Sequence, residues 1–126
     1  MARTNDEVRT APIGEALGAC PHSEISESFL VSMVRRMHMS FHKYGPIREA
    51  FPKNVNAVKC ALNSVAAYTK TGNIEYLVDS ANYLMIEAKR PLRKRAYWKA
   101  GDADLSPGRV WNDGEVSQRY NDFTPA

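Results

Sequence analysis

Apolar side chains recur at steps of three and four in three stretches between residues 23 and 90. That spacing places them on one face of an α-helix. The first predicted helix begins at Ser23 and ends before Gly45-Pro46, because proline cannot continue a helix. Its apolar stripe consists of Ile25, Phe29, Leu30, Met33, Val34, Met37, Phe41 and Tyr44.

The next two stretches predict a pair of helices joined by a short turn. Asn54 is a suitable N-cap for the second helix, which ends near Lys70. Gly72 can take the left-handed conformation that closes a helix, and Asn73 can cap the third helix, which Pro91 ends. Such a short joint predicts an antiparallel αα-hairpin with the first helix packed across it. The predicted buried face of the second helix consists of Val55, Val58, Ala61, Leu62, Val65 and Tyr68.

The third stretch is apolar on more than one side. Its main face consists of Ile74, Leu77, Val78, Ala81, Leu84, Met85 and Ala88. Tyr76, Tyr83 and Ile86 form a second stripe, and Asp79 lies between the two tyrosines. A helix of this kind is buried in a core or in a subunit interface. We therefore expect a homo-oligomer, most simply a symmetric dimer built on the hairpin.

A buried carboxylate such as that of Asp79 needs a partner. The structural interpretation is an ion pair or hydrogen bond, to a tyrosine hydroxyl or to an arginine of a neighbouring helix. The functional alternative is a contact to a ligand or a metal ion.

The chain as a whole is predicted to be a small all-α bundle of three main helices with extended terminal segments. Residues 1–22 form an arm with at most a helical turn around 13–19, residues 23–90 form the bundle, and residues 91–126 form a basic and then irregular tail. No run of eighteen apolar residues and no apolar signal segment occurs, and the two cysteines form no disulfide framework. We expect a cytoplasmic protein with free thiols.

The net charge of +3 is unevenly distributed. Six cations and no acid lie within eleven residues, whereas the rest of the chain carries 11 basic and 14 acidic side chains. We call these six the basic segment: Lys89, Arg90, Arg93, Lys94, Arg95 and Lys99. Tyr97 and Trp98 are interleaved with them, so the segment fits a nucleotide, a nucleic acid or an acidic protein surface. The alternative is a solvated helix end, where cations are favoured by the helix dipole.

Other candidate chemistry is weaker. His38 and His42 have the spacing at which two imidazoles can share a metal, but no further ligands have a supporting spacing, so we predict no metal site. Cys60 lies among alanines and valines and is predicted to be a small core side chain rather than a nucleophile. No P-loop, GxGxxG, GxSxG or CxxC motif occurs.

Three segments, HKYGPIREAFP, TGNIEYLVDSANYLMIEAKRP and SPGRVW, resemble segments of small uncharacterised helical proteins from bacteriophages and actinobacteria. These share a TGN-x-E-x-L-x-D-x-AN-x-x-MIE core, and the resemblance covers about residues 25–120. It implies a phage or mobile-element origin, the host cytoplasm as the compartment, and action by binding a host or defence component.

The pattern of Asp79, Asn82 and Leu84 also resembles the all-α NTP pyrophosphohydrolases of the MazG and dUTPase-like group. That resemblance implies a Mg²⁺ site with Asp79, Glu75 and Glu87 as catalytic residues. The sequence departs from the pattern because the second helix contains no acid, and Tyr76 stands where the family has a glutamate. A divalent cation that bridges phosphates needs more carboxylates than these.

The sequence therefore favours a non-enzymatic binding protein without a cofactor, with a divergent Mg²⁺-dependent NTP pyrophosphohydrolase as the alternative. The predicted binding residues are Arg90, Arg93, Lys94, Arg95, Trp98 and Arg109.

Overall fold

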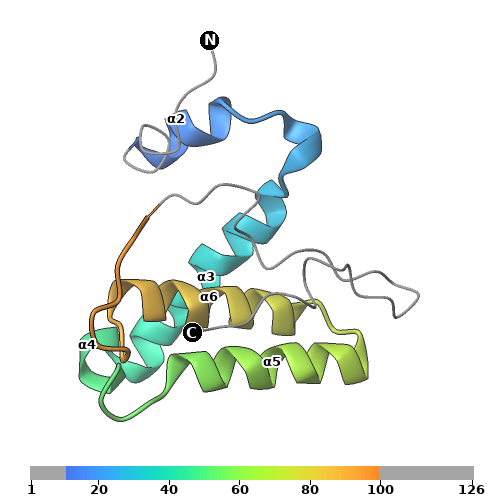
Figure 1. Ribbon diagram of the computed structural model, residues 1–126. Coiled ribbons are helices and arrows are strands. Elements are labelled where there is room, and N and C mark those ends of the chain that lie inside the picture. Colours follow the sequence, from blue (N-terminus) through green and yellow to red (C-terminus); the bar gives the residue numbers. More distant parts are fainter. Residues whose placement is uncertain (1–10, 100–126) are drawn as a thin grey trace, which may run out of the picture. The chain divides into compact units, whose positions relative to one another are not determined.

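The computed structural model describes residues 11–99, and every regular element among them is helical (Figure 1). The elements belong to one compact unit, Pro12–Ala96. They are α2 (Ile13–Gly18), a 3-10 turn η1 (His22–Glu24), α3 (Glu27–Tyr44), α4 (Ile47–Ala50), α5 (Ala57–Thr71) and α6 (Glu75–Lys89). The predicted all-α class with three main helices is confirmed. None of the helices within residues 11–99 has the length and apolarity needed to cross a membrane.

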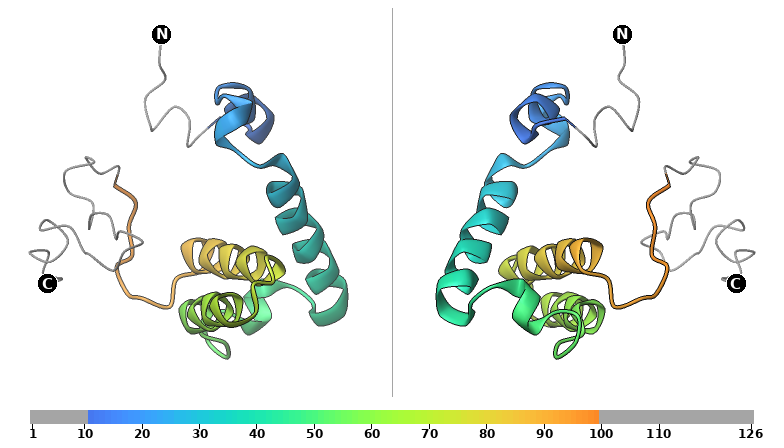
Figure 2. Two further views of the ribbon diagram at one scale, coloured as in Figure 1. Left: turned by 90° about the vertical axis from the view of Figure 1, so that its right-hand side faces the viewer. Right: turned by 90° about the vertical axis from the view of Figure 1, so that its left-hand side faces the viewer.

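The α5 and α6 helices form the predicted antiparallel hairpin and make the most extensive helix contact in the unit (Figures 1 and 2). Gly72 follows α5 with φ 77° and ψ 6°, and its N–H donates to the carbonyl of Tyr68 at 2.7 Å. The Oδ1 atom of Asn73 then accepts a hydrogen bond from the N–H of Glu75, the first residue of α6. The local sequence therefore stops one helix and starts the next within three residues.

Replacing Gly72 with alanine is expected to lower the free energy of unfolding by about 1 kcal/mol, because a side chain is disfavoured at positive φ. No atom within 4 Å would obstruct the new Cβ, so the cost comes from the backbone alone. Gly14 is the matched control. It lies inside α2 with the same open surroundings, and alanine there should leave stability unchanged or slightly increased. Urea denaturation of both variants checks this, and equal effects would contradict it.

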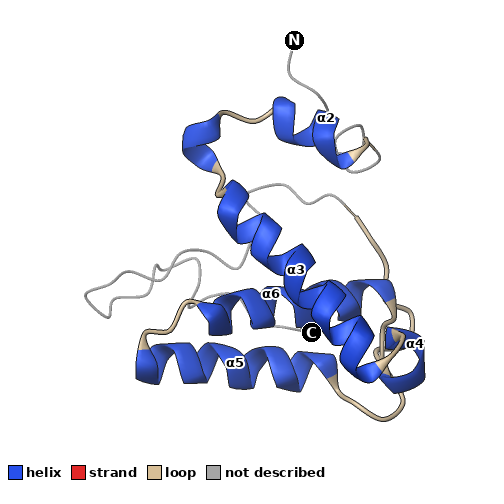
Figure 3. Cartoon of the chain, turned by 180° about the vertical axis from the view of Figure 1, so that it is seen from behind, coloured by secondary structure: helices blue, strands red, loops and turns tan. Residues whose placement is uncertain are grey.

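Helix α3 packs on one side of the hairpin and contacts α6 (Figures 2 and 3). The sequence predicted that this helix would lie across both helices of the pair, but its substantial contact is with α6. As predicted, α3 ends at Gly45. This residue has φ 87°, and its N–H donates to the carbonyl of Phe41 at 2.9 Å. Pro46 then precedes the single turn of α4.

Two predicted helix starts were wrong. Ser23 lies in the 3-10 turn, and α3 begins at Glu27, because Ser26 is the cap whose Oγ accepts from the N–H of Phe29 at 3.1 Å. Likewise, Asn56 caps α5 by accepting from the N–H of Lys59. The predicted cap Asn54 lies in the preceding turn, where its amide donates to the carbonyl of Glu49. In both cases two capping residues are close in sequence and the later one is used.

The predicted buried face of α5 was also largely wrong. Ala61 is buried at 2 % exposure, but Val58, Leu62 and Val65 are 41 %, 64 % and 43 % exposed. The contact with α6 uses small residues instead, with Ala57 buried beside Ala61. Small side chains allow the two helix backbones to approach closely. The larger apolar residues consequently point away from the contact.

Candidate functional site

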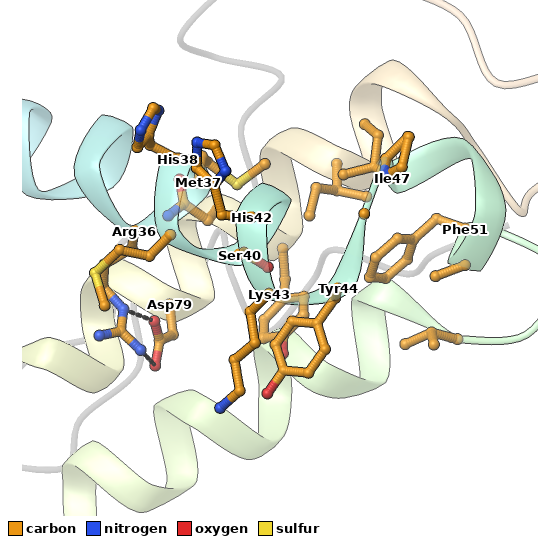
Figure 4. A pocket seen from close by; sticks show the side chains of 18 residues that line it. Arg36, Met37, His38, Ser40, His42, Lys43, Tyr44, Ile47, Phe51 and Asp79 are labelled. Atoms are coloured by element: carbon orange, nitrogen blue, oxygen red, sulfur yellow. Dashed lines mark hydrogen bonds and ion pairs between the residues drawn. The ribbon is translucent and has the colours of Figure 1, made fainter.

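The ion pair of Arg36 and Asp79 joins α3 to α6 (Figure 4). Arg36 Nε lies 2.5 Å from Asp79 Oδ1, and Nη2 lies 3.4 Å from Oδ2, so the guanidinium meets both carboxylate oxygens. Arg36 Nη1 also pairs with Glu75, one turn earlier on α6. The predicted structural interpretation of Asp79, an arginine of a neighbouring helix, is confirmed.

The environment of this cluster shifts two pKa values. Burial on its own would lower the pKa of Arg36, but the hydrogen bonds and charges of Asp79 and Glu75 outweigh it and raise that pKa. Burial raises the pKa of Tyr83, and the nearby groups of Cys60, Asp79 and Tyr44 raise it further. Arg36 therefore stays a cation and Tyr83 a neutral phenol at neutral pH.

The three carboxylates suggested by the hydrolase resemblance do not form one centre. Asp79 and Glu75 are both paired with Arg36. Glu87 lies eight residues beyond Asp79, about 12 Å along the helix axis, and its Oε2 accepts from the N–H of Leu92. Within residues 11–99, no group of three His, Cys, Asp or Glu side chains could hold a metal ion.

A groove of about 870 Å³ lies between the end of α3, α4 and α6 (Figure 4). Its walls are mainly apolar and aromatic, and Arg36 and Asp79 lie at one end of it. His38 and His42, on α3, have ring centroids 4.5 Å apart in an edge-to-face arrangement. The two imidazole rings therefore contact each other edge to face at the rim of the groove.

The basic segment begins on a stem that is anchored to the helical unit. Arg90, the residue after α6, donates from Nε to the carbonyl of Phe51 at 2.9 Å. Glu87 holds the next residues by accepting from the N–H of Leu92 at 2.9 Å. Arg90, one of the predicted binding residues, is therefore part of the anchor through its Nε.

Beyond this stem the cations are exposed. Arg93, Lys94 and Arg95 follow one another at a turn, and Arg95 has a left-handed backbone with φ 60°. None of the three pairs with a carboxylate within residues 11–99. Trp98, 66 % exposed, follows outside the helical unit, and Arg109 lies outside the described residues. Three of the six predicted binding residues are thus contiguous, exposed and without a carboxylate partner within residues 11–99.

Sequence reasoning missed the contacts of three residues that shape these sites. Arg36 is not part of the predicted apolar stripe of α3, and its position in the sequence does not indicate that it would contact Asp79. Asn82 is 6 % exposed, and its Nδ2 donates to the carbonyl of Met33, which ties α6 to α3. Glu87 anchors the basic segment by accepting from the N–H of Leu92. The one feature of the sequence that could have indicated this contact is the position of Glu87 four residues before the helix-ending Pro91.

Comparison of the chain with protein-family models, curated proteins and solved structures found no match. The two resemblances stated from the sequence therefore stay predictions.

Proposed function

We propose that this protein is a non-enzymatic binding protein that holds an anionic partner through Arg93, Lys94 and Arg95. The observation that carries the proposal is the absence of any carboxylate partner for these three cations within residues 11–99, although acids are available on the same unit. Cations that are already paired within the protein would have to break that pairing before they bound an external anion.

The anchored stem supports the same proposal. The bond from Arg90 to Phe51 and the bond from Glu87 to Leu92 fix the chain immediately before the three cations. A fixed starting point reduces the conformational entropy that is lost when a partner binds. Two of the three cations are arginines, whose planar guanidinium matches phosphate and carboxylate groups with two parallel hydrogen bonds.

Among anionic partners, single-stranded nucleic acid is favoured. Tyr97 is 81 % exposed and comes two residues after Arg95 in the chain. Proteins that bind single strands combine cations along the backbone with aromatic rings on which bases stack. A phage-derived protein that binds a host nucleic acid would fit the first resemblance as well.

The test is fluorescence anisotropy of a labelled single-stranded oligonucleotide titrated with the full chain. We expect a Kd of about 10⁻⁴–10⁻⁶ M at physiological salt. Changing Arg93, Lys94 and Arg95 together to alanine should weaken binding on the order of 10- to 50-fold, as the loss of three backbone contacts implies.

The matched control removes three charges elsewhere. Lys53, Lys59 and Lys70 are exposed cations outside the basic segment. Their triple alanine variant has the same net charge as the first variant and should keep most of the affinity. Equal losses in the two variants would show a general charge effect and would overturn the assignment. Absence of binding to the oligonucleotide, with binding to polyglutamate of similar charge, would replace nucleic acid by an acidic protein surface.

A further inference from the structure

The α5–α6 hairpin has a second face, opposite α3, that no described helix covers (Figure 2). Helix α6 turns Asp79 and Asn82 towards α3 and Ser80 towards α5, where Ser80 Oγ donates to the carbonyl of Ala61 at 3.0 Å. The polar residues of α6 are therefore on its inner sides. The 100° rotation per residue then places Leu77, Ala81, Leu84 and Ala88 on the side away from α3, whereas Val78 and Ile86 are buried.

Helix α5 contributes to the same face. Cys60 lies close to Tyr83, which is near Asp79 and Arg36, so Cys60 is on the side of α5 nearer α3. The helical rotation then places Val58, Leu62 and Val65 on the opposite side of α5. The hydrogen bond between Ser80 and Ala61 shows that these two residues lie at the same height in the hairpin. Because the helices are antiparallel, Val58, three residues before Ala61, lies near Leu84, four residues after Ser80. We call the resulting surface the outer face: Val58, Leu62, Val65, Leu77, Ala81, Leu84 and Ala88.

The outer face is apolar and large for a chain of this size. Leu62 is 64 % exposed and Leu84 is 54 % exposed, and none of the seven residues is charged. From these exposures the face presents on the order of 450 Å² of apolar surface, within the roughly 300–600 Å² range of the largest patch on a monomer, which is often functional. A stable dimer buries roughly 800 Å² per partner, of which about 56–65 % is non-polar, so the outer face has the size of the apolar part of such an interface.

We propose that the outer face binds the outer face of a second copy of this chain, so that two hairpins form a four-helix bundle. Because the face has no charge, two identical copies can meet without like-charge repulsion. A two-fold arrangement also suits the sizes of its side chains. Leu62 on α5 is large and 64 % exposed, whereas α6 offers the small residues Ala81 and Ala88 on either side of Leu84. A two-fold axis sets the bulge of each α5 against the small residues of the partner's α6.

The proposal is independent of the basic segment, and its test is the mass of the full chain by size-exclusion chromatography with light scattering. At about 10–100 µM the protein should have twice its chain mass of 14.1 kDa. Leu62→Glu and Leu84→Glu should each weaken association by about 100-fold or more, because a charge is then buried without a partner. Both positions are exposed in one copy, so the variants should keep the helical circular dichroism of the wild type.

Asn63→Glu is the matched control. Asn63 is exposed and adjacent to Leu62 but lies off the outer face, so this variant should remain dimeric. A wild-type mass of one chain would overturn the proposal and leave the face to another occupant, such as the segment after residue 99. A dimer that survives both Leu62→Glu and Leu84→Glu would overturn it too, by placing the interface elsewhere.

Discussion

Replacing Ala61 with leucine is expected to lower the free energy of unfolding by about 2–3 kcal/mol, the upper part of the range for overpacked cores. Ala61 is 2 % exposed at the contact between α5 and α6, and its carbonyl accepts the hydrogen bond from Ser80 Oγ. A leucine side chain has no space there unless the helices separate, and separation would also break that hydrogen bond. Because the hairpin is the most extensive contact of the unit, we expect the melting temperature to fall by about 10 °C or more.

Ala66→Leu is the control for this prediction. Ala66 lies on the same helix and is exposed, so the same change should alter the free energy of unfolding by less than about 0.5 kcal/mol. Both variants can be compared by chemical denaturation monitored by circular dichroism. Equal stability of Ala61→Leu and the wild type would show that the two helices are not held at close approach.

Replacing Arg36 with methionine is expected to cost about 2 kcal/mol. The change leaves the carboxylate of Asp79, which is 26 % exposed, without its cation in a partly buried position. The expected cost lies between that of an exposed ion pair, about 0–1 kcal/mol, and that of a broken buried pair, about 3–5 kcal/mol, because the Arg36 side chain is itself 37 % exposed. The raised pKa of Arg36 contributes stability at every pH below the usual arginine value, so this contribution is constant around neutrality.

Two further variants distinguish the loss of this ion pair from the general effect of removing a charged side chain. Arg35→Met removes the neighbouring exposed arginine and should change stability by less than about 0.5 kcal/mol. The double variant Arg36→Met with Asp79→Leu removes both charges and should be more stable than Arg36→Met alone. If Arg36→Met and Arg35→Met were equally stable, the ion pair would have no structural role.

The existence and order of the main helices could be predicted because local signals determine them. Gly72 has the left-handed backbone that few other residues adopt, Asn73 Oδ1 accepts from the N–H of Glu75, and the glycine and proline of Gly45-Pro46 do not continue a helix. The need of Asp79 for a partner was equally predictable, since a half-buried carboxylate is costly on its own. The identity of that partner was not, because Arg36 is 43 residues away in the sequence.

The faces of α5 and α6 could not be predicted in the same way. A periodic pattern shows that Val58 and Leu62 share one side of α5 and that Leu77 and Leu84 share one side of α6, but it does not show which surface covers each side. Ser80 and Asn82 look like exposed positions in the pattern, yet they are buried and donate to backbone carbonyls. A backbone acceptor on another helix leaves no trace in the sequence, so their burial was found only in the structure.

The proposed binding site rests on a cluster of cations that is visible in the sequence. Arg93, Lys94 and Arg95 form an acid-free cluster that composition alone identifies, and the structure adds that they are unpaired within residues 11–99. The contact of Arg90 with Phe51 could not be predicted, because it depends on how α6 packs beside the turn after α4.

The salt dependence of oligonucleotide binding tests the proposed function most directly. A plot of log K against log salt should be linear for the wild type, and its slope should fall by about 2 when Arg93, Lys94 and Arg95 are changed to alanine, which corresponds to about 0.7 for each lost backbone contact. An unchanged slope in that variant would show that these cations do not contact the anion and would contradict the account.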